Sequence, residues 1–338
     1  MRAGRYRENT RSTFAPSPPG GGLGRGNDQG ERRHFHLPGW LASPHDRYHK
    51  GFTLIELVVV IVLSGILATV VAQFITWPVT AFVAQARRGE LVDIADGALD
   101  RMGREIREAL PNSIRAGCGG QCLEILHAFA GGRYRASPPG DSLSFNPADN
   151  DTGFEWLGPA SGIGEIVAVA GGTTCAGGGA TCLVIYNTGF GAGDAYGGAN
   201  MAAVTAAAAG PPNSLQFSFT DSGFGLGQTA FPQASPDQRF YLVDTPVSYL
   251  CDLGAGTLRR YQGYSIRASQ ADVDSNAELT ALPNPAENAL LADRLTGCAF
   301  SYAAGSGTRN GVVSIRLQLT RDGESVVLHQ QVLVSNLP

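Results

Sequence analysis

Lysine is nearly missing from this chain of 338 residues: Lys50 is the only one, and arginine supplies the rest of the basic charge. That charge is spread unevenly. Residues 1–50 carry nine Lys or Arg against four Asp or Glu, a net charge of +5, which leaves −9 for residues 51–338 out of a total of −4. The chain therefore lacks the basic stripe with which nucleic-acid-binding proteins neutralise phosphates, and we expect no nucleic-acid partner.

Catalytic constellations are also scarce. Four of the six histidines precede Lys50, which leaves only His127 and His329 in the rest of the chain. Neither lies in a Ser/His/Asp or His-Glu-x-x-His frame, and the Gly-rich segment 187–200 lacks the Gly-Lys-Ser/Thr of a phosphate-binding loop. We therefore predict no enzymatic activity and no cofactor, and we interpret segment 187–200 as a surface loop.

Two patterns resemble parts of metal sites. Cys118-x₃-Cys122 followed by His127 would make half of a zinc site, but no fourth ligand lies nearby. The run Asp272-x-Asp274-x-Asn276 resembles the start of a calcium loop without its Gly at position six or its Glu at position twelve. We predict no metal site, and calcium binding remains an open alternative.

The six cysteines all follow the first 117 residues, and their even number fits disulfides in an oxidising compartment. Six cysteines allow 15 connectivities, so the sequence leaves the pairing open. Proximity along the chain favours three pairs, namely Cys118–Cys122, Cys175–Cys182 and Cys251–Cys298.

A run of 24 residues, Phe52 to Ile75, is almost entirely apolar, with Glu56 as its single ionisable side chain. As a helix it is about 36 Å long, enough to cross a hydrocarbon core of about 30 Å. The basic flank before the run, and the lack of Lys or Arg after it until Arg87, orient the N-terminus to the cytoplasm and the remainder to the periplasm. Residues 1–51 have no apolar core of an ordinary secretory signal, and we interpret them as a disordered leader.

Beyond the apolar run we expect residues 78–110 to form the amphipathic second half of the helix, with a break or kink at Pro78. In residues 111–338 alternating patterns predict an antiparallel β-sheet, and Asp322-Gly323 predicts a hairpin turn. Asn284-Pro285 predicts the start of a short helix over residues 289–295. Weaker strand signals lie at Leu123–Leu126, Ser142–Phe145, Ile166–Val169, Leu183–Tyr186 and Leu215–Phe219.

The junction Gly51-Phe52, with Glu56 at the fifth position after the glycine, resembles the prepilin cleavage and N-methylation motif of type IV pilins and type II secretion pseudopilins. The resemblance implies that prepilin peptidase cuts between Gly51 and Phe52 and methylates the new amine. It also implies that Glu56 of one subunit pairs with the Phe52 amine of its neighbour during assembly. Loss of either partner strands a buried charge at a cost of about 3–5 kcal/mol.

Later stretches resemble the MshO-type minor pilins of MSHA pilus systems: Trp77-Pro78-Val79, Gln85–Asp93, Ala95–Leu99, Arg104–Ser113, Gly132–Arg135, Tyr249-x-Cys251, Arg260–Tyr264 and Gly297–Tyr302. This resemblance implies an α+β, type IV pilin-like fold, in which a long N-terminal transmembrane and amphipathic helix packs on an antiparallel β-sheet head. The implied organisation is a leader (1–51), an assembly helix (52–77), its amphipathic second half (78–110) and a pilin head (111–338).

The implied role is a minor subunit that initiates or caps a type IV pilus filament. Its implied partners are prepilin peptidase, the other major and minor pilins, and the inner-membrane assembly platform. Its implied location is first the inner membrane and then the cell-surface filament. Two alternatives remain, namely a minor pseudopilin of a type II secretion system and a membrane-anchored adhesin or enzyme.

Overall fold

The computed structural model describes residues 51–338 except 159–173, 209–211, 283–284 and 306–308. The chain divides into two units at the bond between Gly65 and Ile66. In chain order the helices and strands are α1 (Leu54–Arg107), β1 (Arg115–Gly117), β2 (Cys122–Tyr134), β3 (Gly153–Leu157), β4 (Cys182–Ile185), β5 (Met201–Ala208), β6 (Ser214–Ser218), β7 (Arg239–Asp252), β8 (Thr257–Gln262), α2 (Asn276–Ala281), β9 (Glu287–Ala292), β10 (Leu295–Ala303), β11 (Gly311–Arg321) and β12 (Glu324–Val334). The fold is α+β, with one long helix preceding an antiparallel β head, as the sequence predicts.

Helix α1 continues through Pro78, so the expected break there is wrong. A proline inside a helix removes a single backbone donor, and the turns on either side keep their own hydrogen bonds. At its other end the helix stops at Arg107, three residues earlier than expected, because the next residues turn to meet β2. There the amide of Leu110 donates to the carbonyl of Leu126 at 2.8 Å, and Ala109 forms an isolated bridge with His127.

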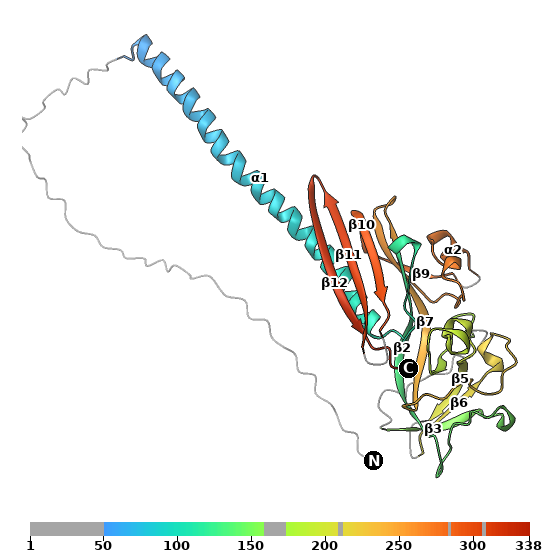
Figure 1. Cartoon of the computed structure of the whole chain (residues 1–338). Coiled ribbons are helices and arrows are strands. Elements are labelled where there is room, and N and C mark those ends of the chain that lie inside the picture. The colour runs from blue at the N-terminus through green and yellow to red at the C-terminus, as the bar shows by residue number, and fades with distance from the viewer. Residues whose placement is uncertain (1–50, 159–173, 209–211, 283–284, 306–308) are drawn as a thin grey trace, which may run out of the picture. The chain divides into compact units, whose positions relative to one another are not determined.

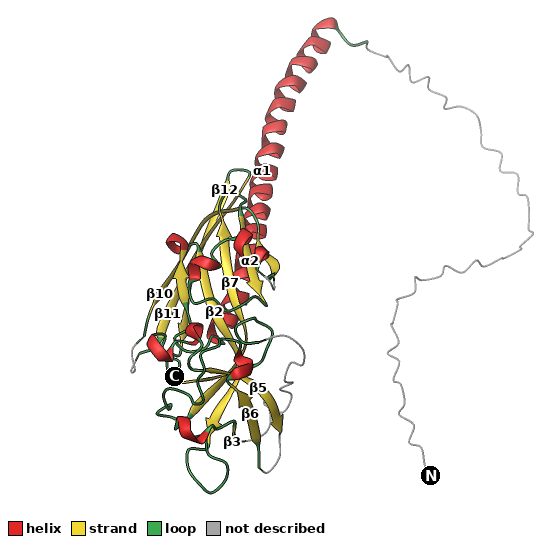
Figure 2. Cartoon of the chain, turned by 90° about the vertical axis from the view of Figure 1, so that its right-hand side faces the viewer, coloured by secondary structure: helices red, strands yellow, loops and turns green. Residues whose placement is uncertain are grey.

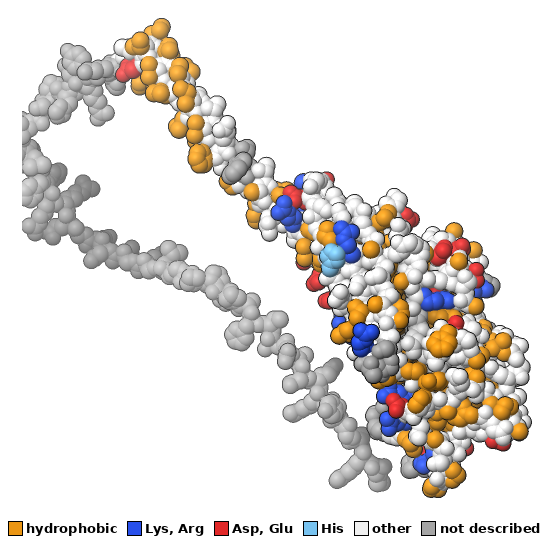
Figure 3. Space-filling model, viewed as in Figure 1, with side chains coloured by type: hydrophobic (Ala, Val, Ile, Leu, Met, Phe, Trp, Pro, Cys, Tyr) orange, Lys and Arg blue, Asp and Glu red, His pale blue; other side chains and the backbone are white. Residues whose placement is uncertain are grey.

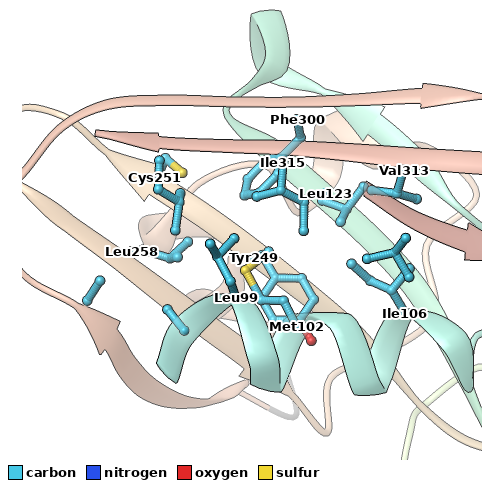
Figure 4. Close-up of a cluster of buried hydrophobic side chains, with 14 of the residues drawn as sticks. Leu99, Met102, Ile106, Leu123, Tyr249, Cys251, Leu258, Phe300, Val313 and Ile315 are labelled. Atoms are coloured by element: carbon cyan, nitrogen blue, oxygen red, sulfur yellow. The ribbon is translucent and has the colours of Figure 1, made fainter. Parts of the chain in front are cut away.

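The last five turns of α1 supply one wall of the main core. The buried residues of this face recur three or four positions apart, as one face of a helix requires: Leu91, Ala95, Ala98, Leu99, Met102 and Ile106. Figure 4 shows Leu99, Met102 and Ile106 pointing toward side chains that come from several strands, among them Tyr249, Leu258 and Ile315. This helix-on-sheet packing removes the apolar stripe from water and holds the C-terminal half of α1 against the head.

The larger sheet has nine strands, and every pairing in it is antiparallel. Its order runs β1-β2-β3-β6-β5-β4-β7-β8-β9, and β2 also pairs with β7. That extra pairing closes β2, β3, β6, β5, β4 and β7 into a ring of six strands. Figures 1 and 2 place the labelled ring strands β3, β5 and β6 at one end of the head, with β2 and β7 running on toward β10–β12.

Aromatic side chains fill the ring. Phe154, Phe217 and Phe240 are almost fully buried, and the rings of Phe154 and Phe240 pack edge to face with centroids 5.3 Å apart. Tyr134 and Trp156 complete this second core. Such a cluster buries a large apolar area in a small space, so the ring has a core separate from that beneath α1.

A second, three-stranded sheet has the order β10-β11-β12. In β11 buried and half-buried residues alternate, and Val313, Ile315, Leu317 and Leu319 face the main core. The β11–β12 hairpin turns at Asp322-Gly323, as expected. The disulfide Cys251–Cys298 joins β7 of the larger sheet to β10 of the smaller one.

Three local expectations differ from the structure or fall outside it. Residues 289–295, expected as a helix, lie mostly in β9, which pairs with β8. Segment Ser142–Phe145 is not a strand, although the amide of Leu143 donates to the carbonyl of Arg135. Segment Ile166–Val169 lies outside the described residues.

Candidate functional site

The junction between Gly51 and Phe52 is exposed and precedes the first turn of α1. The side chain of Phe52 is 83% exposed, and a Cβ placed on Gly51 would meet no heavy atom within 4 Å. The fold therefore does not require glycine at this position. A protease that needs an unobstructed backbone would find one here.

Thr53 and Glu56 form a capping box at the start of α1. The amide of Glu56 donates to Thr53 Oγ1 at 3.3 Å, while the amide and hydroxyl of Thr53 both donate to Glu56 Oε2 at 3.2 Å. These bonds satisfy backbone donors that the first helical turn leaves free. Our sequence interpretation assigned Glu56 to charge pairing and missed this second role, although Thr-x-x-Glu is the pattern that signals it.

One oxygen of the Glu56 carboxylate is uncommitted. Both hydrogen bonds from Thr53 go to Oε2, and Oε1 has no hydrogen-bond partner within the described part of the chain. Between Gly51 and Arg87 the sequence holds no other ionisable side chain. Oε2 therefore holds the Glu56 side chain in place, and Oε1 remains available to bind a cation.

The apolar side chains that follow are exposed along the helix. Ile61, Leu67 and Phe74 are 61%, 64% and 77% exposed, and the most hydrophobic stretch of α1 buries nothing within the chain. Among the described residues α1 is the one helix long and apolar enough to cross a membrane. Exposed apolar surface of this extent requires a lipid or protein environment.

A buried ion pair fixes the C-terminal half of α1 on the sheet. Arg260 Nε of β8 donates to Glu105 Oε2 at 2.7 Å, and the hydroxyl of Tyr249 donates to the same oxygen. Burial by itself would raise the pKa of Glu105, but these hydrogen bonds and the arginine charge outweigh it, so the pKa is lowered. Glu105 is therefore held ionised at the helix–sheet contact.

A second set of ion pairs joins α1 to the hairpin region. Glu90 accepts from Arg294 at 2.8 Å and from Arg321 at 2.5 Å, and Arg88 pairs with Glu324. The hydrogen bond from Arg294 is the main reason that the pKa of Glu90 is lowered. Because these side chains are partly exposed, the ion pairs fix the position of α1 on the head more than they contribute to stability.

The other predicted residues have structural surroundings. Cys118–Cys122, Cys175–Cys182 and Cys251–Cys298 form three disulfides, so neither Cys118 nor Cys122 is a thiolate ligand. Asp274 lies just before α2, where its amide donates to Glu278 Oε2. Across the described residues no group of three or more His, Cys, Asp or Glu side chains is arranged to hold a metal ion.

His127 lies between two carboxylates. Its Nδ1 is 2.8 Å from Asp244 Oδ1, and its Nε2 is 3.3 Å from Glu108 Oε2. The hydrogen bond to Asp244 is the main reason that the pKa of His127 is raised above its usual value. Both ring nitrogens are occupied, so the imidazole links the end of α1 to β7 and has no nitrogen free to activate a nucleophile.

Comparison with known proteins gives one match. The prokaryotic N-terminal methylation motif matches residues 46–72, which include the Gly51–Phe52 junction and Glu56. No curated protein matches the chain, and no solved structure does.

This motif belongs to structural subunits that prepilin peptidase processes and that assemble with other pilins. It coincides with the exposed junction, the capped Glu56 and the apolar helix, and an antiparallel β head follows them. The motif and these features together indicate a type IV pilin-like protein, either a pilin or a pseudopilin.

Proposed function

We propose that the chain is a minor pilin of an MSHA-type type IV pilus, similar to the MshO subunits. In this role prepilin peptidase processes it, and its N-terminal helix carries it into the filament, which it initiates or caps. The observation that carries the proposal is the exposed Gly51–Phe52 junction ahead of an apolar helix whose single charge is Glu56. The later stretches that resemble MshO favour this subunit class.

The size of the head supports a minor subunit. Cleavage after Gly51 leaves 287 residues, and major pilins are generally much smaller. The six-stranded ring accounts for much of the additional length, since it adds four strands between β2 and β7. A subunit present in few copies at one end of a filament has room for such an addition.

Assembly follows from the charges at the start of α1. Cleavage frees a positive amine at Phe52, and the uncommitted Oε1 of Glu56 on a neighbouring subunit is an acceptor for it. Pairing removes two charges from lipid at once. It also sets the axial register, because each subunit carries the amine of Phe52 and the carboxylate of Glu56 four positions apart. An acidic head in the periplasm, with its three disulfides, fits the orientation that the basic leader predicts.

The mature N-terminus tests the processing step. Mass spectrometry of the protein from membranes should find an N-methylated Phe52. An intact leader, or a cut at another bond, would reject a pilin of either kind.

A pair of glycine variants sharpens this experiment. Gly51→Val should fold and insert but remain uncut, because nothing in the fold opposes a side chain there. Gly65→Val is the matched control, since a Cβ at Gly65 also meets no heavy atom within 4 Å. Normal processing of Gly51→Val would contradict the assigned cleavage site.

Location separates the pilus from the secretion alternative. A minor pilin should be detected in filaments sheared from the cell surface, and its deletion should reduce the number of filaments. Normal filaments together with lost protein export in the deletion strain would instead assign the chain to a type II secretion system.

A further inference from the structure

The face of the β10–β12 sheet that points away from the main core carries a row of aligned polar residues. Strand register places Ala299, Arg316 and His329 side by side across the three strands. The next row is Ser301, Ser314 and Gln331. These six residues, with parts of Ile315 and Gln330, line a groove of about 570 Å³, which we call the sheet groove.

Arg316, the arginine of the sheet groove, has no carboxylate partner in the part of the chain that the structure describes. Its only hydrogen bond in the described structure goes from Nη2 to Gln318 Oε1, at the long distance of 3.4 Å. Arg135 and Arg260 of the head are engaged by Glu155 and Glu105, whereas Arg259, like Arg316, has only an amide partner among the described residues. A guanidinium has five N–H donors in a planar fork, so most of the donors on Arg316 have no partner within the described residues.

Acidic side chains are nearly absent from the sheet around this groove. Strands β10, β11 and β12 contain one acidic residue, Glu324, which lies at the hairpin end and pairs with Arg88. Figure 3 shows a basic and a histidine side chain together over β11 and β12, among mostly uncharged atoms. On a chain whose residues 51–338 carry a net charge of −9, this spot is electrostatically unlike its surroundings.

The other side chains that line the sheet groove are short or can form hydrogen bonds. Ser301, Ser314 and Gln331 supply hydroxyl and amide groups to the lining, and Ala299 contributes only a methyl group. Both edges of β11 are paired along its length, so its backbone offers no hydrogen bonds to an added peptide strand. The groove therefore suits a ligand that carries a planar anion surrounded by hydroxyl groups.

We propose that the sheet groove binds the carboxylate group of an acidic saccharide. Arg316 receives the carboxylate through paired N–H donors, and the serine, glutamine and histidine side chains bind the neighbouring hydroxyl groups. This site is independent of whether the chain serves a pilus or a secretion filament, because it uses only residues of the small sheet.

The test uses the full processed chain in detergent micelles and isothermal titration calorimetry. The probe is tri-galacturonic acid, and its fully methyl-esterified form is the matched neutral ligand. We expect the acid to bind in the sub-millimolar to millimolar range, typical of an open polar groove. We expect the ester to bind at least about tenfold more weakly, because it offers no charge to the guanidinium.

Protein variants identify the site. Arg316→Gln should weaken binding of tri-galacturonic acid about ten- to a hundredfold, the range for a lost charge-assisted hydrogen bond. Arg316→Lys should recover only part of the affinity, because an ammonium lacks the planar fork. The control is Arg259→Gln on β8, a half-buried arginine that also donates only to an amide oxygen, that of Asn288. It should bind like the wild type.

Several results would overturn the proposal. The proposal fails if the acid does not bind at 10 mM, or if the acid and its ester bind with equal affinity. It also fails if the Arg316→Gln variant melts like the wild type and binds the acid with unchanged affinity. Equal or tighter binding of a tri-glutamate peptide would assign the groove to an acidic protein segment instead. Binding of inorganic phosphate with no binding of the saccharide would reduce the site to a general anion site, which also contradicts the proposal.

Discussion

Glu105 and Arg260 form an ion pair across the contact between helix α1 and strand β8, with 2.7 Å between Oε2 and Nε. Their side chains are only 15% and 9% exposed. Neither residue is near the other in sequence, so the pair defines how far along the sheet the helix lies. A buried pair of this kind gives little net stability, but removing one partner leaves an uncompensated charge in the core.

Arg260→Gln should therefore destabilise the head by about 3 kcal/mol. Urea denaturation of the processed chain, followed by tryptophan fluorescence or circular dichroism, measures the change. Arg101→Gln is the control: Arg101 also contacts Glu105, at 3.3 Å, but it is 46% exposed and lies on the same helix. The control should lose less than about 0.5 kcal/mol. Equal losses in the two variants would contradict a special role for the buried pair.

The capping role of Glu56 and its proposed role in charge pairing are separable by mutation. Glu56→Gln keeps a side chain that caps the helix but removes the charge, whereas Thr53→Val keeps the charge and removes the cap. If charge pairing drives assembly, the first variant should be cleaved yet missing from filaments, and the second should be incorporated with a frayed first turn. Immunoblots of sheared filaments and of membranes measure both. Filaments that contain Glu56→Gln at wild-type levels would refute the pairing.

The disulfides should differ in their contribution to stability. Cys251–Cys298 closes a loop with a sequence separation of 47 and ties two sheets together, whereas Cys118–Cys122 has a separation of 4. Loop-closure entropy predicts losses of about 4 and about 2 kcal/mol when each pair is replaced by serines. Thermal unfolding of the two double variants tests the order. A larger loss for Cys118–Cys122 would show that native-state effects outweigh chain entropy.

His127 gives the head a pH dependence of defined sign. Its folded-state pKa is raised, first by the hydrogen bond to Asp244, so the protonated form is favoured by folding. Its contribution is then fully present below the unfolded value of about 6.5 and is lost as pH rises through the raised folded value. The size should stay below about 1 kcal/mol because Asp244 and Glu108 are 45% and 59% exposed.

Melting temperatures from pH 5 to 8 measure this contribution. His127→Gln should lose stability relative to the wild type at the acidic end and converge with it at the alkaline end. His329→Gln is the control, since that exposed imidazole has no carboxylate partner within the described residues. An unchanged pH profile in His127→Gln would show that the pair has no energetic role.

The sequence predicts the long helix and the C-terminal hairpin because their patterns are local. An apolar run of 24 residues is sufficient for a spanning helix, and Asp322-Gly323 between alternating residues is sufficient for a turn. The site residues Gly51, Phe52 and Glu56 also lie close together in sequence, so a short motif contains them.

The six-stranded ring was not predictable in this way. It depends on the pairing of β2 with β7, and residues more than 100 positions apart, such as Arg133 and Arg239, face each other there. Its other strands are short, and the chain between them is rich in Gly and Ala, so periodicity is weak. The sequence of one strand does not show which distant strand it pairs with.

The sequence also predicted one helix start at the wrong place. Asn284-Pro285 is a plausible start signal, but the residues after it pair with β8, so tertiary pairing outweighs local propensity. The true short helix, α2, begins eight residues before Asn284, at Asn276, with a capping box between Ser275 and Glu278. The same Ser/Thr-x-x-Glu pattern at Thr53 was also missed, so a systematic search for it would have located both helix starts.

The ring has a consequence for how this head can diversify. The chain enters it after Tyr134 and leaves it at Gln238, and the amide of Tyr134 donates to the carbonyl of Gln238 at 2.9 Å. A segment whose two ends already touch can be lengthened, shortened or exchanged at little entropic cost to the rest of the fold. The helix-binding parts of β2 and β7 would keep their contacts with α1 through such an exchange. An engineer could therefore replace the ring without rebuilding the part of the head that packs against α1.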